Sequence, residues 1–430
     1  MFRFTDLIIF RVTRDCNLSC KYCFMKEKHK HKGEIIDLEL FKKIIQRIIK
    51  QRIVNHREKM NLSFVLHGGE ALIIGAENLY KMLEYMKTEF MRNGIQHSIA
   101  CQTNATLLDD DIIKTFQKFE VTLGLSFDGI NGANKNRTDI KQEVFENKFD
   151  LITENKVPFS FITVVGKNNV DTIHETQEYL LDMAGTPEYK MNYVEDMDNP
   201  GEESEIELTG EEIFEKIWKP ELEKFLKEGY SREWHIKNLL NKTIVDIITY
   251  HDTVFMSGRG CFGKYCGTGM SMIAVEPDGE MDLCDRYSKS FPEAHVQHAL
   301  DYDFLGLHQI HKVLEHTLTK IDYYKEIGCD TCYASYICEY GCPTFYYSKH
   351  GKYGVEQRIV CDQFKKIYDY VLKHIEYFIE VYFNKYNEKI FSEDIVYGMN
   401  LTMCNYINNK GFDLQLQDDK RTIIIKKVEK

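Results

Sequence analysis

The sequence lacks a surplus of basic residues. Its 430 residues include 55 lysines and arginines against 67 aspartates and glutamates, which gives a formal net charge of -12 at pH 7. The isoelectric point is near 5.7. Binding to a nucleic-acid backbone depends on lysine and arginine to neutralise phosphates, so this balance argues against a nucleic-acid partner.

Long apolar runs are missing as well. No run approaches the roughly 20 residues that a helix needs to cross a bilayer, and the first residues show no basic segment followed by an apolar one. We therefore expect a cytoplasmic protein without a membrane partner. The sequence also shows no internal repeat and no low-complexity tract, and its length predicts two or three globular domains.

Cysteine, in contrast, is plentiful, with 13 residues. In a large chain without an export signal, clustered thiols bind metal more often than they form disulfides. Two cysteines stand apart from the clusters, Cys101 and Cys404, and we expect both to be buried as small hydrophobic residues.

From residue 7 to about 195, short β-branched runs alternate with helical periodicity. The runs cover residues 7–12, 62–66, 97–101, 121–126, 158–165 and 189–194. Between the first two, apolar residues at i, i+3 and i+4 spacing follow Asp37, a candidate N-cap, and predict an amphipathic helix over 38–49. Six strand–helix units predict the α/β class and a parallel sheet curled into a partial (β/α)6 TIM-like barrel. Its chemistry is expected at the carboxyl ends of the strands.

The pattern changes at an acidic, turn-rich segment, residues 199–215. We place the end of the barrel domain, 1–235, after it. Residues 236–365 are expected to form a cysteine-rich domain with helices and a β-hairpin, whose turn is Pro277-Asp278-Gly279. For 366–430 we predict a C-terminal helix and tail of unassigned role, with an aromatic-rich helix from Gln363 to about Lys385 and an edge strand within 421–430.

A short loop after the first predicted strand carries three cysteines, Cys16, Cys20 and Cys23. A structural zinc site would need a fourth ligand, which His29 or His31 could supply. Alternatively, three thiolates can hold a four-iron cluster and leave one iron without a protein ligand. With the aromatic Tyr22 before its last cysteine, the loop resembles the signature of the radical S-adenosylmethionine (SAM) superfamily. In that family the cofactor itself chelates the open iron.

The stretch Gly68-Gly69-Glu70 follows the second predicted strand and resembles the family's glycine-glycine-glutamate motif. The resemblance implies that the carboxylate and nearby backbone hold the ammonium group of the cofactor, while glycine permits a close approach. The next residue, Ala71, replaces the usual proline.

Two further strand ends, "CQTNATLL" and "LSFDGI", also resemble motifs of the family. The resemblance implies that Ser126 faces the cofactor carboxylate, and it assigns three residues to the cavity lining: Gln102, Asn104 and Asp128. Ala105 replaces the usual glycine. The glycine-rich segment that usually follows the serine motif is absent, so we expect no cofactor or substrate role for Arg137.

A second array of eight cysteines lies downstream: Cys261, Cys266, Cys284, Cys329, Cys332, Cys338, Cys342 and Cys361. The last seven resemble the SPASM domain, an auxiliary-cluster module of many radical SAM peptide modifiers. By resemblance to anaerobic sulfatase-maturing enzymes, one cluster would use Cys261, Cys266, Cys284 and Cys342, and the other Cys329, Cys332, Cys338 and Cys361. Two zinc sites are the alternative. The resemblance implies SAM and three [4Fe-4S] clusters, with the fully liganded auxiliary pair draining electrons from the substrate.

Asp285 directly follows Cys284 in the stretch "LCDRY". In sulfatase-maturing enzymes, an aspartate at the matching position is the candidate base that removes a proton from the substrate, and the resemblance gives Asp285 that role. The same stretch resembles maturases that cross-link an aromatic ring. An exposed turn residue, or a structural ion pair with Arg286, is the alternative.

Together these motifs predict a radical SAM enzyme with a SPASM domain that oxidises a side chain of a peptide or protein, with an electron donor such as flavodoxin or ferredoxin. A carbon–carbon cross-link in a ribosomally made peptide is the first choice, ahead of a thioether bond and of sulfatase-type oxidation of serine or cysteine. Little chain precedes the first strand, which argues against maturases with an N-terminal leader-binding domain. The alternative of a different class is a non-catalytic zinc–cysteine scaffold.

Overall fold

The computed structural model describes residues 6–25, 33–138, 140–184, 188–194, 204–228, 272–286, 295–301, 325–326, 328–329, 331–334, 358–374, 412–416 and 423–427. Contacts divide the chain into two compact units. The first comprises Met1–Glu207, Gly267–Tyr323 and Cys342–Val355, and the second Leu208–Cys266, Tyr324–Gly341 and Glu356–Lys430. The domain boundary predicted near residue 235 lies outside the described residues.

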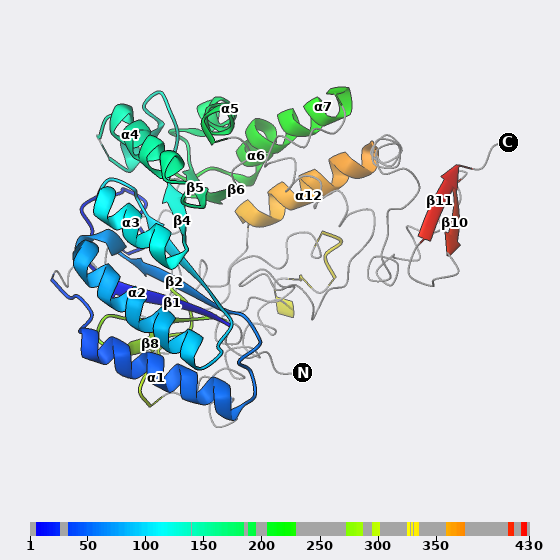
Figure 1. Cartoon of the computed structure of the whole chain (residues 1–430). Coiled ribbons are helices and arrows are strands. Elements are labelled where there is room, and N and C mark those ends of the chain that lie inside the picture. The colour runs from blue at the N-terminus through cyan, green and yellow to red at the C-terminus, as the bar shows by residue number, and fades with distance from the viewer. Residues whose placement is uncertain are drawn as a thin grey trace. The chain divides into compact units, whose positions relative to one another are not determined.

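A nine-stranded sheet forms the first unit, in the order β6-β5-β4-β3-β2-β1-β7-β8-β9 (Figure 1). Its first six strands are β1 (Leu7–Thr13), β2 (Leu62–Gly68), β3 (His97–Thr103), β4 (Val121–Ser126), β5 (Phe159–Val165) and β6 (Glu188–Tyr193). Each of these pairs in parallel with the next. The six predicted strands are therefore confirmed, and the open strand order makes the barrel partial rather than closed.

Helices connect these parallel strands: α1 (Leu38–Val54), α2 (Gly75–Arg92), α3 (Asp110–Phe119), α4 (Gln142–Glu154) and α5 (Ile173–Ala184). Helix α1 packs beside α2, and α2 beside α3, so that the three cover the outer face of the sheet (Figure 1). Short 3-10 helices over Ala71–Ile74, Ala133–Asn136 and Val170–Thr172 lie in the loops after β2, β4 and β5. Such an arrangement leaves the carboxyl ends of the strands free for a site.

The start of α1 shows why the predicted helix forms. The Asp37 side chain accepts a hydrogen bond of 2.9 Å from the backbone N–H of Leu40, which satisfies one of the unpaired donors at the helix N-terminus. The buried face of α1 brings Phe41 against Phe10 and Phe64 of the sheet, with ring centroids 5.1 and 6.4 Å away. The predicted helix is confirmed, and it continues beyond residue 49.

The predicted hairpin also forms, from β7 (Met272–Val275) and β8 (Glu280–Asp282). Gly279 takes φ of 85° in its turn, a conformation that glycine adopts at little cost. Strand β7 pairs in parallel with β1, and β9 (His295–His298) follows β8. The hairpin that the sequence assigns to the cysteine-rich domain therefore extends the sheet of the barrel.

The described part of the second unit contains α6 (Gly210–Ile213), a π-helix (Phe214–Trp218), α7 (Lys219–Glu228), α12 (Arg358–Lys373) and the antiparallel pair β10 (Phe412–Leu416) and β11 (Ile423–Lys427). Helix α12 packs against α6 and begins before the predicted Gln363. Gln363 is itself buried, as are Ile367 and Val371, which follow it at i+4 and i+8 on the same helix. The predicted tail strand is confirmed as β11. The predicted domain division at 365 and 366 falls inside α12.

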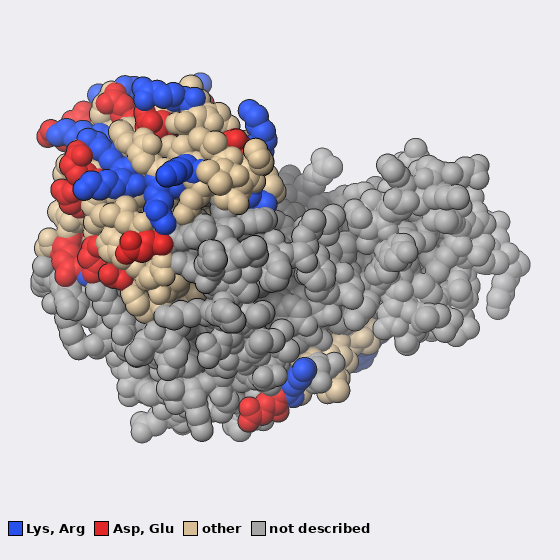
Figure 2. All heavy atoms as spheres, turned by 90° about the horizontal axis from the view of Figure 1, so that it is seen from below, with Lys and Arg blue, Asp and Glu red and all other residues tan. Residues whose placement is uncertain are grey.

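None of the described helices is long and apolar enough to cross a membrane. On the face shown in Figure 2, lysine and arginine side chains are interspersed with aspartate and glutamate over the described residues. Exposed pairs of opposite charge recur on the surface helices, as between Lys81 and Glu77 on α2. Charge of both signs is therefore mixed on this part of the surface.

Candidate active site

The loop that follows β1 carries Cys16, Cys20 and Cys23, each of intermediate exposure and none in a disulfide. Burial raises the pKa of Cys16 to about 12, and the Glu70 carboxylate and the two other thiols add to the rise. Burial also raises the pKa of Cys20 to about 11, although the positive charge of Arg137 opposes it. The three thiols thus lie close enough to disfavour one another's thiolate forms.

This donor set fits a positively charged iron–sulfur cluster. Metal binding requires thiolates, and a bound cation supplies the charge that makes them favourable. Across the described ranges, no three cysteine, histidine, aspartate or glutamate side chains converge closely enough to hold a single metal ion. A four-iron cluster does not need such convergence, because each thiolate binds a different iron. His29 and His31, the alternative zinc ligands, lie outside the described residues.

The glycines of the Gly68-Gly69-Glu70 stretch bring β2 against this loop. The backbone N–H of Gly69 donates to the carbonyl of Thr13 at 3.0 Å, and that of Glu70 to the carbonyl of Asp15 at 2.7 Å. A Cβ atom on Gly69 would lie 2.3 Å from the Asp15 carbonyl oxygen, so no larger residue fits. In this structure, the close approach that the glycines permit is to the backbone of the cysteine loop.

The Glu70 side chain is buried and already accepts three hydrogen bonds. Its Oε1 accepts from the Thr103 hydroxyl at 2.7 Å and from the Leu72 N–H at 3.1 Å, and its Oε2 accepts from the Asn104 N–H at 2.7 Å. Burial raises the pKa of Glu70, an effect that these donors oppose. The carboxylate therefore joins the ends of β2 and β3, which the sequence did not predict. Its contact with the cofactor ammonium stays a prediction.

Gln102 and Ser126 meet at the ends of β3 and β4. The Gln102 amide donates to the Ser126 hydroxyl at 2.8 Å, across the backbone of Gly124. A Cβ atom on Gly124 would lie 2.3 Å from the Gln102 amide oxygen, so the glycine makes room for this side chain. The structure thus brings together two of the residues that the resemblance assigns to the cofactor cavity.

Asn104 contacts the cysteine loop. Its amide donates to the Asn17 side chain at 2.9 Å, and Asn17 donates to the Thr106 hydroxyl at 2.8 Å. Ala105, which replaces the usual glycine, lies between Asn104 and Thr106 in the chain and adopts φ of 66°. Sequence analysis missed Asn17, whose only signal is its position directly after Cys16.

Asp128 is buried at the end of β4 and also reaches the loop. Its carboxylate accepts a hydrogen bond from the Tyr22 hydroxyl and pairs with the Arg137 guanidinium at 3.1 Å. Arg137 is buried too, and it lies near Cys20 and over the Tyr22 ring. Arg137 therefore lies beside the cysteine loop, and its expected lack of a cofactor or substrate role stays a prediction. A buried arginine was not foreseeable in the polar stretch "KNRTDIKQ", which resembles a surface loop.

Cys284 and Asp285 follow β8. The Cys284 thiol lies 3.2 Å from the Asp285 carboxylate, and the backbone N–H of Arg286 donates to the Cys284 sulfur at 3.5 Å. Burial alone would raise the pKa of Asp285, but the positive charges of His67 and Arg11 outweigh it, so the pKa lies below its ordinary value. Asp285 is therefore an ionised carboxylate able to accept a proton.

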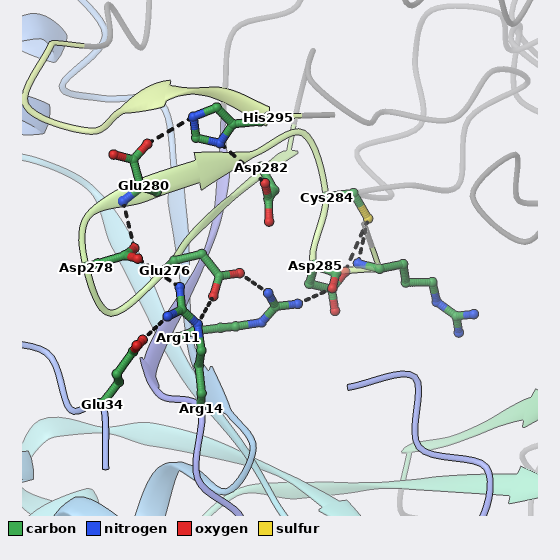
Figure 3. A network of polar contacts seen from close by, with 11 residues as sticks. Arg11, Arg14, Glu34, Glu276, Asp278, Glu280, Asp282, Cys284, Asp285 and His295 are labelled. Carbon is green, nitrogen blue, oxygen red and sulfur yellow. Dashed lines mark hydrogen bonds and ion pairs between the residues drawn. The ribbon is translucent and has the colours of Figure 1, made fainter. Parts of the chain in front are cut away.

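A buried network of charges anchors this turn to β1 (Figure 3). The Arg11 guanidinium donates to the backbone carbonyl of Asp285 and to the Glu276 carboxylate, which also pairs with Arg14 at 3.1 Å. Arg14 in turn pairs with Asp278 at 3.0 Å. Sequence analysis missed Arg11 and Glu276. Two features of the sequence could have indicated them: Arg11 is a charged residue within an apolar strand, and Glu276 directly follows a second apolar strand.

The structure describes three other cysteines of the second array. Cys329 and Cys332 lie in one turn, where the N–H of Cys332 donates to the carbonyl of Cys329 at 3.3 Å. The next residue, Tyr333, donates from its hydroxyl to Asp369 of α12 at 3.3 Å, and Cys361 lies on the same helix. Four further predicted ligands lie outside the described residues: Cys261, Cys266, Cys338 and Cys342.

The two cysteines that stand apart from the clusters differ in what the structure describes. Cys101 is buried in β3, as expected, and Cys404 lies outside the described residues.

Sequence comparisons agree with the geometry of this site. Residues 10–180 match the model of the Radical SAM superfamily. The chain is 24% identical over 381 residues to a cysteine-type anaerobic sulfatase-maturating enzyme of Clostridium perfringens, an alignment that covers 86% of this chain and 97% of the relative. A similar enzyme of Clostridium novyi is 28% identical over 40% of this chain and 47% of its own length. The subtilosin biosynthesis protein AlbA of Bacillus subtilis is 21% identical over 71% of this chain and 60% of AlbA.

Solved structures share the fold. The structure of anSMEcpe with bound AdoMet and the Cp18Cys peptide superposes with a TM-score of 0.68 at 21% identity, over 87% of this chain and 98% of that one. Streptococcus suis SuiB bound to the precursor peptide SuiA superposes with a TM-score of 0.56 at 14% identity, over 84% and 76% of the two chains. Residues 10–180 of this chain thus carry a radical SAM domain.

Proposed function

We propose that this chain is a radical SAM enzyme that oxidises a side chain of a peptide or protein. The observation that carries the proposal is the loop of three cysteines, held at the carboxyl edge of the parallel sheet by the ends of β2, β3 and β4. Similarity to sulfatase-maturating enzymes over most of the chain supports a peptide substrate.

In this proposal Cys16, Cys20 and Cys23 hold a four-iron cluster. When bound, the cluster and SAM would supply the radical chemistry that removes a hydrogen atom from the substrate. Gln102 and Ser126 offer polar groups to the cofactor from inside the barrel. Arg137 is a further candidate for binding an anionic group, because its buried Nε has no hydrogen-bond partner among the described residues.

A side chain that has given up a hydrogen atom must lose one more electron and one proton to form a cross-link or a carbonyl. We assign the proton to the Asp285 carboxylate, which its positive neighbours keep ionised. We assign the electron to an auxiliary cluster with the adjacent Cys284 among its ligands, and Cys329, Cys332 and Cys361 to a second one. Flavodoxin or ferredoxin would supply the electron that starts the reaction.

A carbon–carbon cross-link in a ribosomally made peptide remains our first choice of product, and the similarity to AlbA, a protein of bacteriocin biosynthesis, supports a peptide of this kind as substrate. The second candidate is oxidation of a cysteine or serine, which the sulfatase-maturating relatives favour because that alignment covers 86% of this chain. A thioether is the third. All three begin with loss of a hydrogen atom from the substrate. Both kinds of cross-link and the oxidation of serine remove two hydrogen atoms in total, so fragmentation of the peptide, and not its intact mass, distinguishes them.

The experiment uses anaerobically reconstituted protein with SAM and dithionite. We expect about twelve iron atoms per chain, three clusters of four, and release of 5'-deoxyadenosine. Alanine at Cys16, Cys20 and Cys23 together should remove about four of the iron atoms and abolish that release. Continued release from this triple variant would refute the assignment of the loop. Colourless protein that holds zinc would instead favour the non-catalytic scaffold.

A panel of peptides then tests the substrate class. The probes are short peptides that contain cysteine, serine or an aromatic residue, each deuterated in the side chain. Transfer of deuterium into 5'-deoxyadenosine identifies the residue that reacts, and fragmentation of the peptide by tandem mass spectrometry identifies the product. Transfer only from a non-peptide compound, such as a deuterated sugar tested in parallel, would refute a peptide substrate.

A further inference from the structure

The structure contains a set of contacts around Tyr22 that sequence analysis did not foresee. Tyr22 lies between Cys20 and Cys23, and its hydroxyl donates to Oδ2 of Asp128, which is only 1% exposed. The other carboxylate oxygen of Asp128 accepts from Arg137 at 3.1 Å and from the backbone N–H of Val164 at 3.0 Å. One buried carboxylate therefore connects the cysteine loop with the ends of β4 and β5.

Arg137 completes the arrangement from the other side of the ring. Its guanidinium carbon lies 5.9 Å from the centroid of the Tyr22 ring, within the range of a cation–π contact. The same guanidinium neutralises the buried charge of Asp128, which burial without a partner would make costly. The neighbouring backbone also binds the loop, since the N–H of Lys21 donates to the carbonyl of Asn136 at 2.8 Å.

The segment that bears these groups is itself fixed. The backbone N–H of Asp128 donates to the side chain of Asn134 at 2.9 Å, and the N–H of Arg137 donates to the carbonyl of Asn134 at 2.7 Å. The Asn169 side chain donates to the carbonyl of Asp128 at 2.9 Å. Tyr22 thus binds to a rigid partner, and its position is set from outside the loop.

We propose that Tyr22, Asp128 and Arg137 form a latch that fixes the spacing of Cys20 and Cys23. The latch makes Tyr22 and Asp128 positioning residues of the cluster, acting through the loop rather than through the cofactor. This inference rests on the proposed function in taking the loop as the cluster site. It goes further than the proposed function because it assigns a role to the hydroxyl group of Tyr22, which holds the cysteine loop through Asp128.

Tyr22→Phe tests the latch, because it keeps the ring and removes only the hydroxyl. Losing a hydrogen bond to a charged partner should weaken retention of the cluster, with chelator-induced loss of the SAM-responsive paramagnetic signal about tenfold faster. The SAM dissociation constant of chains that keep the cluster should stay within about twofold. Asp128→Asn, which leaves the buried Arg137 guanidinium without its counter-charge, should speed the loss of the cluster at least as much.

Tyr179→Phe is the matched control. Its hydroxyl also donates to a carboxylate, that of Glu146, at 3.2 Å, but the pair joins α5 and α4 away from the loop. The control should lose cluster at the wild-type rate. Cluster loss from Tyr22→Phe at that same rate would overturn the latch, as would a tenfold weaker SAM affinity with the cluster fully retained. Wild-type protein that binds no iron would instead refute the proposed function.

Discussion

At the scale of single residues, Glu70 shows how a motif residue can combine two tasks. The resemblance assigns its carboxylate to the cofactor, whereas the structure engages both oxygens with Thr103, Leu72 and Asn104. A carboxylate can accept about four hydrogen bonds, so one position stays available for an ammonium group. Both tasks can be measured, because they affect different properties of the protein.

We predict that Glu70→Ala lowers the free energy of unfolding by about 2 to 4 kcal/mol, since it leaves three buried donors without an acceptor. Thermal unfolding measures this loss. In the folded fraction, SAM affinity should fall about ten- to a hundred-fold if the remaining lone pair holds the ammonium group. Unchanged SAM affinity would leave Glu70 a positioning residue alone. Glu77→Ala on the exposed face of α2 is the control and should unfold like wild type.

Ala105 is a second residue whose conformation the sequence signals. The family motif has glycine at this position, and Ala105 adopts φ of 66°, in the left-handed region that disfavours residues with a side chain. We predict that Ala105→Gly raises the stability by about 0.5 to 1 kcal/mol, the relief of strain less the added freedom of the unfolded chain. Ala100→Gly, in the extended β3, should lower it by a similar amount. Thermal unfolding of both variants decides, and equal destabilisation would contradict the expected strain.

The site was therefore predictable in part at this scale. The resemblance of the strand-end motifs to those of the radical SAM family indicated the cysteine loop, Gln102 and Ser126, and the structure brings the last two side chains into contact. Arg137 was not predictable, since its burial depends on Asp128, which lies nine residues away around a turn. The tertiary partner decides whether a charged residue is exposed or buried.

At the scale of elements, the strands were predictable from the sequence, because the β-branched runs that indicate a strand lie within the strand itself. The docking of β7 on β1 did not, since a Pro-Asp-Gly turn predicts a hairpin but gives no information about which strand it will join. The buried charges supply that information. Arg11 within β1 needs an acidic partner, and Glu276 at the end of β7 provides it.

We predict that Glu276→Ala lowers the free energy of unfolding by about 3 to 5 kcal/mol, because it leaves the buried Arg11 and Arg14 without a shared carboxylate. Glu34→Ala removes a half-exposed partner of Arg14 and should cost at most about 1 kcal/mol. Denaturant unfolding of the two variants gives the comparison. A loss as small for Glu276→Ala as for Glu34→Ala would show that the network is dispensable for stability.

At the scale of the whole molecule, Asp285 is the residue to which we assign the proton of the reaction, and it lies beside Cys284 while Arg11 of β1 binds its backbone carbonyl. We predict that Asp285→Asn still permits release of 5'-deoxyadenosine, because hydrogen abstraction precedes loss of the proton. The product formed per 5'-deoxyadenosine should fall by about 10²- to 10⁴-fold, as expected for loss of a general base. Mass spectrometry of both products at equal iron content measures the ratio.

Asp278→Asn is the control, since Asp278 belongs to the same hairpin and pairs with Arg14 rather than with the Cys284 turn. It should keep the wild-type ratio. If Asp285→Asn also keeps that ratio, the proton leaves to another residue or to solvent. A parallel fall of cleavage and product, with loss of iron, would instead identify a structural role for Asp285.

The pairing of β1 with β7 also determines the order in which the protein can assemble. Arg11 and Glu276 are 265 residues apart, so a ribosome that adds about 5 to 20 residues per second needs roughly 10 to 50 s between them. During this interval β2 can cover one edge of β1, while the edge that β7 will occupy stays open. An open edge of an apolar strand can pair with other chains. The strand that leads into the cysteine loop therefore becomes fully enclosed only late in synthesis.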